Sequence, residues 1–151
     1  MHLNDILTSE NILTHVDGVS KKRVLELISD FCAQENKNID PSEAFECLIA
    51  REKLGSTGIG HGVAIPHGRL NSIKTATGML IQLEHPIDFG APDKKPVDLI
   101  FGVFVPEKTT EEHLELLSSL AKIFSNATLR EKMRQAPDAQ TLYDLITTVG
   151  S

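Results

Sequence analysis

The amino-acid sequence predicts an α/β sandwich, in which helices cover the faces of a sheet with few strands. One short strand-like segment and two helical patterns come first, further apolar strand-like segments occupy the middle, and three helical patterns end the chain. This alternation is typical of layered α/β proteins. With 151 residues, the chain is long enough to form one domain over residues 1–151 with its own hydrophobic core.

The first half of the chain carries clear start and stop signals for helices. Residues 10–17 are expected to form a short strand, and residues 20–36 a helix capped by the serine that opens it. Asp40 and Pro41 indicate the start of a second helix, because aspartate accepts hydrogen bonds from the first turn and proline fits the first helical position. This helix should end at Gly55.

The middle of the chain supplies the remaining strands. The segment 62–70, GVAIPHGRL, is expected to form a strand that ends near its Pro-His-Gly, and residues 75–84 to form the next one. Residues 97–105, VDLIFGVFV, are almost continuously apolar, which is typical of a strand covered on both faces. Helices are then expected over roughly 110–124, 127–135 and 139–149, the first of them capped by Thr109 or Thr110.

Composition and charge exclude several classes of protein. Hydrophobic residues make up 40% and charged residues 24% of the chain, which is typical of soluble globular proteins. The net charge of −6 argues against nucleic-acid binding, which favours a basic face. No apolar run approaches the roughly 20 residues that span a bilayer, and no signal-peptide pattern opens the chain. We therefore expect a cytoplasmic protein without membrane insertion.

A glycine-rich stretch, GSTGIGHGVAIPHGRL, occupies residues 55–70. The spacing of Gly55 and Gly60 imitates a P-loop, but His-Gly follows where that motif requires Lys and then Ser or Thr. The dinucleotide-binding fingerprint also fails, since its third glycine is absent. Two interpretations remain. Backbone N–H groups around Gly58 and Gly60, with the hydroxyls of Ser56 and Thr57, could bind an anion, or the glycines could only permit a tight turn.

His67 ends this stretch beside a proline. A neutral imidazole is nucleophilic near physiological pH, and a phosphoryl group on a ring nitrogen is easily passed on. Carrying it requires donors and a cation for the phosphoryl oxygens, which the glycine-rich backbone and Arg69 could supply. The alternative is a histidine that only makes a structural hydrogen bond.

Two further residues come from helices. His113 falls in the first turn of the helix over 110–124 and shares a face with its apolar residues, so it should point toward the core. There it could orient a phosphoryl group on His67, or it could be a satisfied core histidine. Arg51 lies in the last turn of the helix that begins at Pro41. It could bind a phosphate bidentately, or only interact with the helix dipole.

A metal site would have to use His61, His67 and His113. Their spacing matches neither H-x-x-x-H nor H-E-x-x-H, and no acidic residue lies at ligand spacing near the first two. We therefore expect neither a metal ion nor another cofactor.

Three blocks together carry a specific resemblance: REKLGSTGIGHGVAIPHGRL, HPIDFGAPDKKPVDLIFGVFVPE and EEHLELLSSLAKIF. They resemble, in this order and over essentially the whole chain, the IIA domains of the fructose/mannitol class of the bacterial phosphotransferase system, and most of all its nitrogen-regulatory branch. The resemblance implies an α/β sandwich with a small mixed sheet flanked by helices on both sides. Many relatives carry Asn where this chain has His61, which adds a titratable group beside the site.

The resemblance also implies the roles of single residues. His67 would be the phosphorylated histidine, His113 a second active-site histidine close to it, and Arg51 a support for the phosphoryl group. Ser56, Thr57, Gly58 and Gly60 are the candidate phosphoryl-binding residues of the glycine-rich stretch. The expected activity is a metal-independent phosphotransferase relay within the phosphoenolpyruvate-dependent system.

The expected partners follow from the same resemblance. A histidine phosphocarrier protein, of the HPr or NPr type, would be the donor, and regulatory or potassium-transport proteins would be the targets of a nitrogen-regulatory switch. Two alternatives stay open on the sequence. The chain could be a sugar-transport IIA component that passes phosphate to a fructose- or mannitol-type IIB, or a binding module that no longer transfers phosphate.

Overall fold

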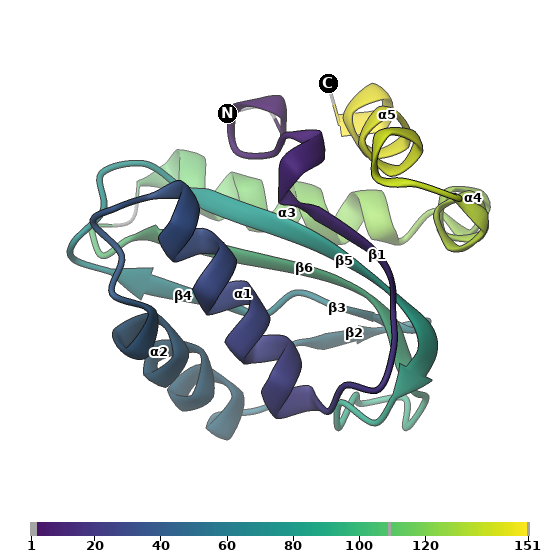
Figure 1. Ribbon diagram of the computed structural model, residues 1–151, viewed down its shortest axis with the longest axis horizontal. Helices are drawn as coiled ribbons and strands as arrows, with labels where there is room; N and C mark the ends of the chain where they lie inside the picture. The colour runs from purple at the N-terminus through teal and green to yellow at the C-terminus, as the bar shows by residue number, and fades with distance from the viewer. Residues whose placement is uncertain (1–2, 109, 151) are drawn as a thin grey trace.

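The computed structural model of the protein describes residues 3–108 and 110–150. Helices lie on both sides of one mixed sheet (Figure 1), which confirms the predicted α/β sandwich. The helical elements are η1 (Leu3–Asp5), η2 (Ser9–Asn11), α1 (Lys21–Glu35), α2 (Pro41–Lys53), α3 (Glu111–Phe124), α4 (Ala127–Gln135) and α5 (Ala139–Gly150). The strands are β1 (Ile12–Val16), β2 (Gly58–Gly60), β3 (Val63–Ala64), β4 (His67–Leu70), β5 (Thr77–Ile87) and β6 (Val97–Pro106).

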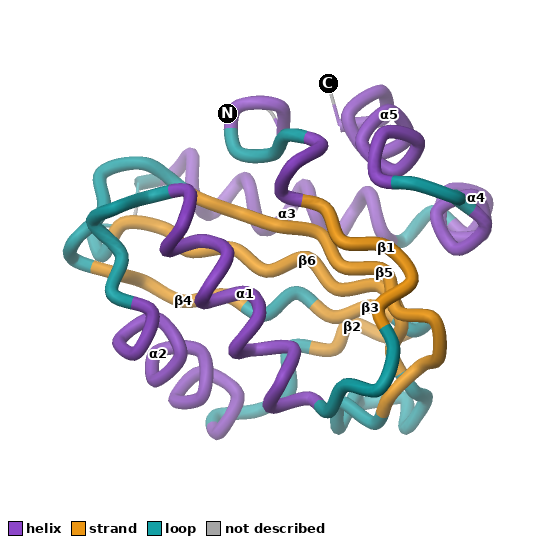
Figure 2. The backbone as a smooth tube through the Cα atoms, in the orientation of Figure 1, coloured by secondary structure: helices purple, strands orange, loops and turns teal. Residues whose placement is uncertain are grey.

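The sheet is built around the antiparallel pair β5 and β6, the two long strands in Figure 2. Within the described residues the strand order is β1-β5-β6-β3-β2, and β4 also pairs with β6. β1 runs parallel to β5, and β3 and β4 both run parallel to β6. The glycine-rich stretch therefore runs along the edge of β6 that faces away from β5.

Two hydrophobic clusters cover the two faces of the sheet. One lies under α1 and α2, and the other lies under α3, α4, α5 and the N-terminal turns. Figure 1 shows α1 and α2 on one side of the sheet and α3 on the other. Along β6, Phe101 and Val103 belong to the cluster under α3, whereas Ile100 and Phe104 belong to the cluster under α1. Alternate residues of a strand point to opposite faces, so β6 is buried on both, as its apolar sequence predicts.

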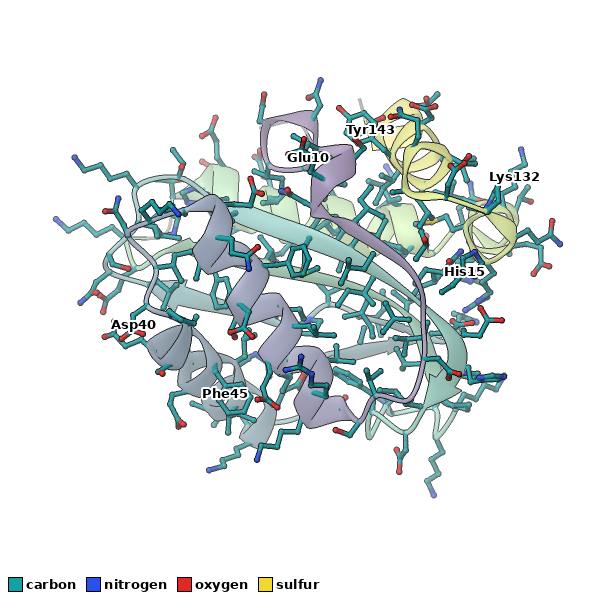
Figure 3. All side chains as sticks on the ribbon, viewed as in Figure 1. Glu10, His15, Asp40, Phe45, Lys132 and Tyr143 are labelled. Atoms are coloured by element: carbon teal, nitrogen blue, oxygen red, sulfur yellow. The ribbon has the colours of Figure 1, made fainter. Side chains whose placement is uncertain are left out.

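The helix caps are largely those that the sequence predicts. Ser20 accepts a hydrogen bond from the backbone N–H of Arg23. Asp40, at the start of α2 in Figure 3, accepts one from the N–H of Ser42. Thr110 is the N-cap of α3, and the alternative cap, Thr109, lies outside the described residues.

The single strand predicted over residues 62–70 is wrong. Residues 62–70 form two short strands, β3 and β4, which follow β2 at Gly58–Gly60, and β4 begins at His67 instead of ending near it. Gly60 and Gly62 have positive φ angles of 93° and 79°, which allows the chain to reverse between β2 and β3. Pro66 then interrupts the ladder, because it has no N–H to donate.

The strand predicted over residues 75–84 is longer than expected and runs on through Ile87. Buried within it, Gln82 donates through Nε2 to the carbonyl oxygens of Met133 and Ala136, at 2.8 and 3.0 Å. These bonds satisfy the C-terminal end of α4 and tie this helix to the sheet.

Candidate active site

His67 lies at the edge of the sheet, on the face that α3 covers. It is the first residue of β4 and pairs with Val103 of β6. Side chains of paired residues point to the same face, and Val103 packs in the cluster under α3. His67 therefore lines a pocket of about 190 Å³ that Leu117 and Ala121 of α3 help to form.

The ring of His67 is held by a backbone carbonyl. Its Nδ1 lies 2.8 Å from the carbonyl oxygen of Ile65. A carbonyl can only accept, so Nδ1 carries the hydrogen, and the neutral ring then has its lone pair on Nε2. The structure thus distinguishes the two ring nitrogens, which the sequence does not: Nε2 is the nucleophilic one.

The same pocket contains five of the seven residues predicted for the site. The lining comprises His67, Arg51, Ser56, Thr57 and Gly58, together with Ile59, Ile65, Leu117 and Ala121. Gly60 and His113 lie outside it. Arg51, in the last turn of α2, and His67, at the start of β4, are 16 residues apart in the sequence and line the same pocket.

Hydrogen bonds within the loop already engage the predicted phosphoryl-binding donors. The hydroxyl of Ser56 donates to the carbonyl of Phe89 at 2.9 Å and accepts the N–H of Gly58 at 3.0 Å. The N–H and hydroxyl of Thr57 both bind the carboxylate of Glu52. These donors fix the loop in this state, and direct contact with a phosphoryl group stays a prediction that requires them to change partners.

Glu52 is the residue that sequence reasoning missed. Its side chain is only 6% exposed, and its carboxylate accepts from Thr57 and lies 3.4 Å from Nζ of Lys21. A negative charge in the last turn of a helix opposes the helix dipole. That unfavourable position was the signal that this carboxylate has specific partners.

Arg51 lies in the last turn of α2 and lines the pocket, as expected. Its Nη1 donates to the carbonyl oxygen of Gly55 at 2.8 Å. A guanidinium has five N–H donors, and this bond uses one of them. The bond to Gly55 holds the guanidinium over the beginning of the loop, beside the pocket.

His113 is in the first turn of α3, on its buried face, and is 6% exposed. Its Nδ1 accepts the backbone N–H of Thr110 at 3.3 Å and lies 3.1 Å from the Thr110 hydroxyl oxygen. It lines a second pocket, of about 580 Å³, with Lys74. Leu117, one turn further along α3, reaches the His67 pocket, so His113 lies one turn away from that pocket. Contact between the two rings stays a prediction.

The other candidates lie further out. His61 is exposed, with a positive φ of 58°, and its backbone N–H donates to Oδ2 of Asp93 at 3.0 Å. Arg69 is exposed on β4 and does not line the pocket. Gly60 pairs with Val63 in the turn between β2 and β3.

Two features of the described residues bear on the class of site. No group of three or more His, Cys, Asp or Glu side chains is arranged to hold a metal ion. Among the helices of residues 3–108 and 110–150, none has the length and apolar character that crossing a membrane requires.

The whole chain is similar to one family of proteins. The family described as "Phosphoenolpyruvate-dependent sugar phosphotransferase system, EIIA 2" matches residues 5–149. The nitrogen regulatory protein of Pseudomonas aeruginosa is 47% identical over 149 residues, which cover 99% of this chain and 97% of that protein. The nitrogen regulatory protein of Escherichia coli K12 is 43% identical over 148 residues, covering 97% and 90% of the two chains.

A solved structure agrees with these relatives. The crystal structure of nitrogen regulatory protein IIA-Ntr from Neisseria meningitidis superposes with a TM-score of 0.89 at 46% identity. The match covers 96% of this chain and 99% of the other. The helices and the mixed sheet described above are therefore those of this fold.

Proposed function

The chain belongs to the phosphoenolpyruvate-dependent sugar phosphotransferase system EIIA 2 family, and we propose that it takes up a phosphoryl group on Nε2 of His67 from a histidine phosphocarrier protein. The observation that carries this proposal is the hydrogen bond from Nδ1 of His67 to the carbonyl of Ile65. It leaves the unprotonated nitrogen of the ring available for attack on phosphorus.

The transfer is a direct exchange of one N–P bond for another. The lone pair on Nε2 of His67 attacks the phosphorus in line while the bond to the carrier's imidazole breaks and its electron pair returns to that ring. Attack by a neutral imidazole places positive charge on the ring of His67. The carbonyl of Ile65 stabilises that charge through the Nδ1–H, so no base has to remove a proton before the attack.

Two side chains are proposed to support the phosphoryl oxygens. Arg51 lines the pocket and has guanidinium N–H groups beyond the one that binds Gly55, and an arginine fork matches a phosphoryl group well. His113 accepts at Nδ1, so its neutral ring carries a hydrogen on Nε2 that can donate. Donors fixed before the reaction stabilise the charge of the transition state.

The surface around the pocket suits a protein partner. The three large hydrophobic side chains that are exposed in the described residues are Leu54, Ile59 and Leu114. Ile59 lines the pocket, Leu54 follows α2, and Leu114 lies one turn before Leu117 on α3. An apolar centre with a polar rim is typical of transient interfaces. Exposed glutamates on α3 favour a carrier with basic side chains: Glu111, Glu112 and Glu115.

The role of the phosphorylated form is proposed to be regulatory. The full-length relatives at 47% and 43% identity are nitrogen regulatory proteins, so the phosphorylation state of His67 would be read by protein targets, including regulators or potassium-transport proteins. A sugar-transport role would instead predict that the phosphoryl group is lost when a sugar and its IIB partner are supplied.

Intact mass spectrometry tests the proposal. The protein is incubated with phosphoenolpyruvate, enzyme I and a phosphocarrier, and compared with His67→Ala. His61→Asn is the matched control, since it removes another histidine of the same stretch and asparagine tolerates a positive φ. We expect one acid-labile phosphoryl adduct on the wild type and on His61→Asn, and none on His67→Ala. Absence of an adduct on the wild type with every carrier tried would contradict the proposal.

A further inference from the structure

Glu52 is buried at the junction of three segments. Its carboxylate accepts the backbone N–H of Thr57 at 3.0 Å and the Thr57 hydroxyl, and it lies 3.4 Å from Nζ of Lys21. Removing a carboxylate from water is costly unless hydrogen bonds and an opposite charge replace the solvent. Glu52 has both: the two hydrogen bonds from Thr57 and the ammonium group of Lys21.

Lys21 connects this carboxylate to a second part of the loop region. Its Nζ donates to the carbonyl oxygen of Phe89 at 3.0 Å and lies 4.6 Å from the centre of the Phe89 ring. The same carbonyl accepts the hydroxyl of Ser56 at 2.9 Å. The first residue of α1, the last turn of α2 and the turn before β6 are therefore joined around residues 56 and 57.

A continuous chain of hydrogen bonds leads from Glu52 to the reactive histidine. Thr57 is held by Glu52 and accepts, through its own carbonyl, the N–H of Ile65 at 3.0 Å. The carbonyl of Ile65 in turn accepts Nδ1–H of His67 at 2.8 Å. Each link fixes the backbone that makes the next one, so the orientation of the His67 ring depends on the position of Thr57.

We propose that Glu52, charge-paired with Lys21, is a positioning residue that sets the tautomer and orientation of the His67 ring through Thr57 and Ile65. The inference rests on the proposed phosphoryl transfer, which supplies the function of that ring. Neither side chain contacts the phosphorus. Their effect is to hold the Ile65 carbonyl where it keeps the hydrogen on Nδ1 and leaves Nε2 directed for attack.

Two variants test the proposal. Glu52→Gln keeps the size of the side chain but loses one acceptor and the charge that pairs with Lys21. Lys21→Met removes the ammonium and keeps the apolar stem, and it serves if Glu52→Gln folds poorly. In the unphosphorylated protein, ¹⁵N NMR at a pH at which the ring is neutral should show a smaller fraction of the Nδ1–H tautomer of His67 in both variants.

Single-turnover transfer from the phosphocarrier is measured on the same samples. We expect the rate at saturating carrier to fall by about 10- to 100-fold in Glu52→Gln, the size of effect that misplacing a reacting group produces. The dissociation constant for the carrier should stay unchanged, because neither residue is one of the exposed apolar side chains around the pocket. Lys21→Met should change the rate in the same direction and by less.

Gln82→Ala is the control for a general loss of stability. It removes buried hydrogen bonds between β5 and the end of α4, and Gln82 pairs with Leu99 on β6, four residues from the partner of His67. It should change neither the tautomer nor the saturated rate.

Two results would overturn the positioning role: Glu52→Gln with wild-type tautomer and rate, or Gln82→Ala with the same changes as Glu52→Gln. A wild type that accepts no phosphoryl group contradicts the proposed function instead, and the tautomer comparison still decides the role of Glu52.

Discussion

The ring of His67 donates through Nδ1 to the carbonyl of Ile65, whereas the ring of His113 accepts through Nδ1 the backbone N–H of Thr110, so the two histidines are held in opposite tautomers. In their neutral forms, Nε2 of His67 has a lone pair and Nε2 of His113 has a hydrogen. In the proposed transfer, the first ring would attack phosphorus and the second would donate to a phosphoryl oxygen. Backbone groups impose both states, one from the connection between β3 and β4 and one from a helix N-terminus.

Substitution of His113 should slow phosphoryl uptake without moving its site. We expect His113→Ala to lower the single-turnover rate by about 100- to 1,000-fold, the usual effect of removing one donor from a transition state. Thr110→Ala, which removes the hydroxyl contact to Nδ1, should have a smaller effect. Rapid-quench measurement of the adduct checks this. A His113→Ala protein that is phosphorylated as fast as the wild type would exclude His113 from the transfer.

Arg51→Lys tests whether the fork of the guanidinium matters or only its charge. Lysine keeps the positive charge but cannot bind Gly55 and a phosphoryl group with one planar set of donors. We therefore expect the phosphohistidine of Arg51→Lys to form about 10- to 100-fold more slowly, as measured by intact mass against time. Lys53→Arg is the matched control on the same helical turn, and it should behave as the wild type. Equal rates in Arg51→Lys and the wild type would refute a bidentate role.

The exposed leucines should determine carrier affinity and leave the chemistry unchanged. Leu54 and Leu114 are 86% and 53% exposed, so replacing them with serine costs the fold little. We expect Leu114→Ser to weaken binding of the carrier by about 1–3 kcal/mol if it is a central contact, with an unchanged rate at saturation. Titration calorimetry and single-turnover kinetics separate the two effects. A changed saturated rate with unchanged affinity would contradict a docking role.

Local signals were sufficient to predict most of the fold. The caps at Ser20 and Asp40 and the continuous apolar run of β6 depend on residues close together in the sequence, and the structure confirms them. The division of residues 58–70 into three strands was not predictable from alternation alone. It depends on the positive φ angles of Gly60 and Gly62 and on the pairing of two separate segments, β3 and β4, with β6.

The sequence predicted which residues belong to the site, but it did not predict the contacts that hold them. Arg51 and His67 were proposed from residue chemistry and from resemblance, and the pocket brings them together. The burial of Glu52 depends on Lys21, a residue 31 positions earlier, and on the return of the loop through Thr57. Neither contact leaves a periodic pattern in the sequence.

Gly58 should be essential for packing rather than for backbone freedom. A Cβ placed on it would lie 2.7 Å from Cβ of Ala91, far inside van der Waals contact. We expect Gly58→Ala to destabilise the protein by about 1–3 kcal/mol, the usual cost of overpacking, in urea unfolding. Adding Ala91→Gly should recover part of this loss, because it removes the nearest clashing atom. Additive losses in the double variant would show that the two positions do not interact.

The hydrogen bond between His85 and Asp17 makes the stability of the fold depend on pH, in a direction that follows from the two pKa shifts. Nδ1 of His85 lies 3.0 Å from Oδ1 of Asp17; this hydrogen bond raises the pKa of His85 and lowers the pKa of Asp17. A histidine whose pKa is raised on folding stabilises the fold below its unfolded pKa, about 6.5, and this contribution is lost as pH rises through the folded value. The aspartate's contribution is present above its own ordinary pKa and is lost in acid.

Asp17→Asn should therefore lower the NMR titration midpoint of His85 toward the value of a free histidine. The wild type should be more stable than the variant in weakly acidic solution, and this difference should shrink as the pH is raised past the folded pKa of His85. Both side chains are exposed, with 74% and 61% of their surfaces accessible, so added salt should reduce the effect by screening the charges. A midpoint that does not move in Asp17→Asn would assign the raised pKa of His85 to a group other than Asp17.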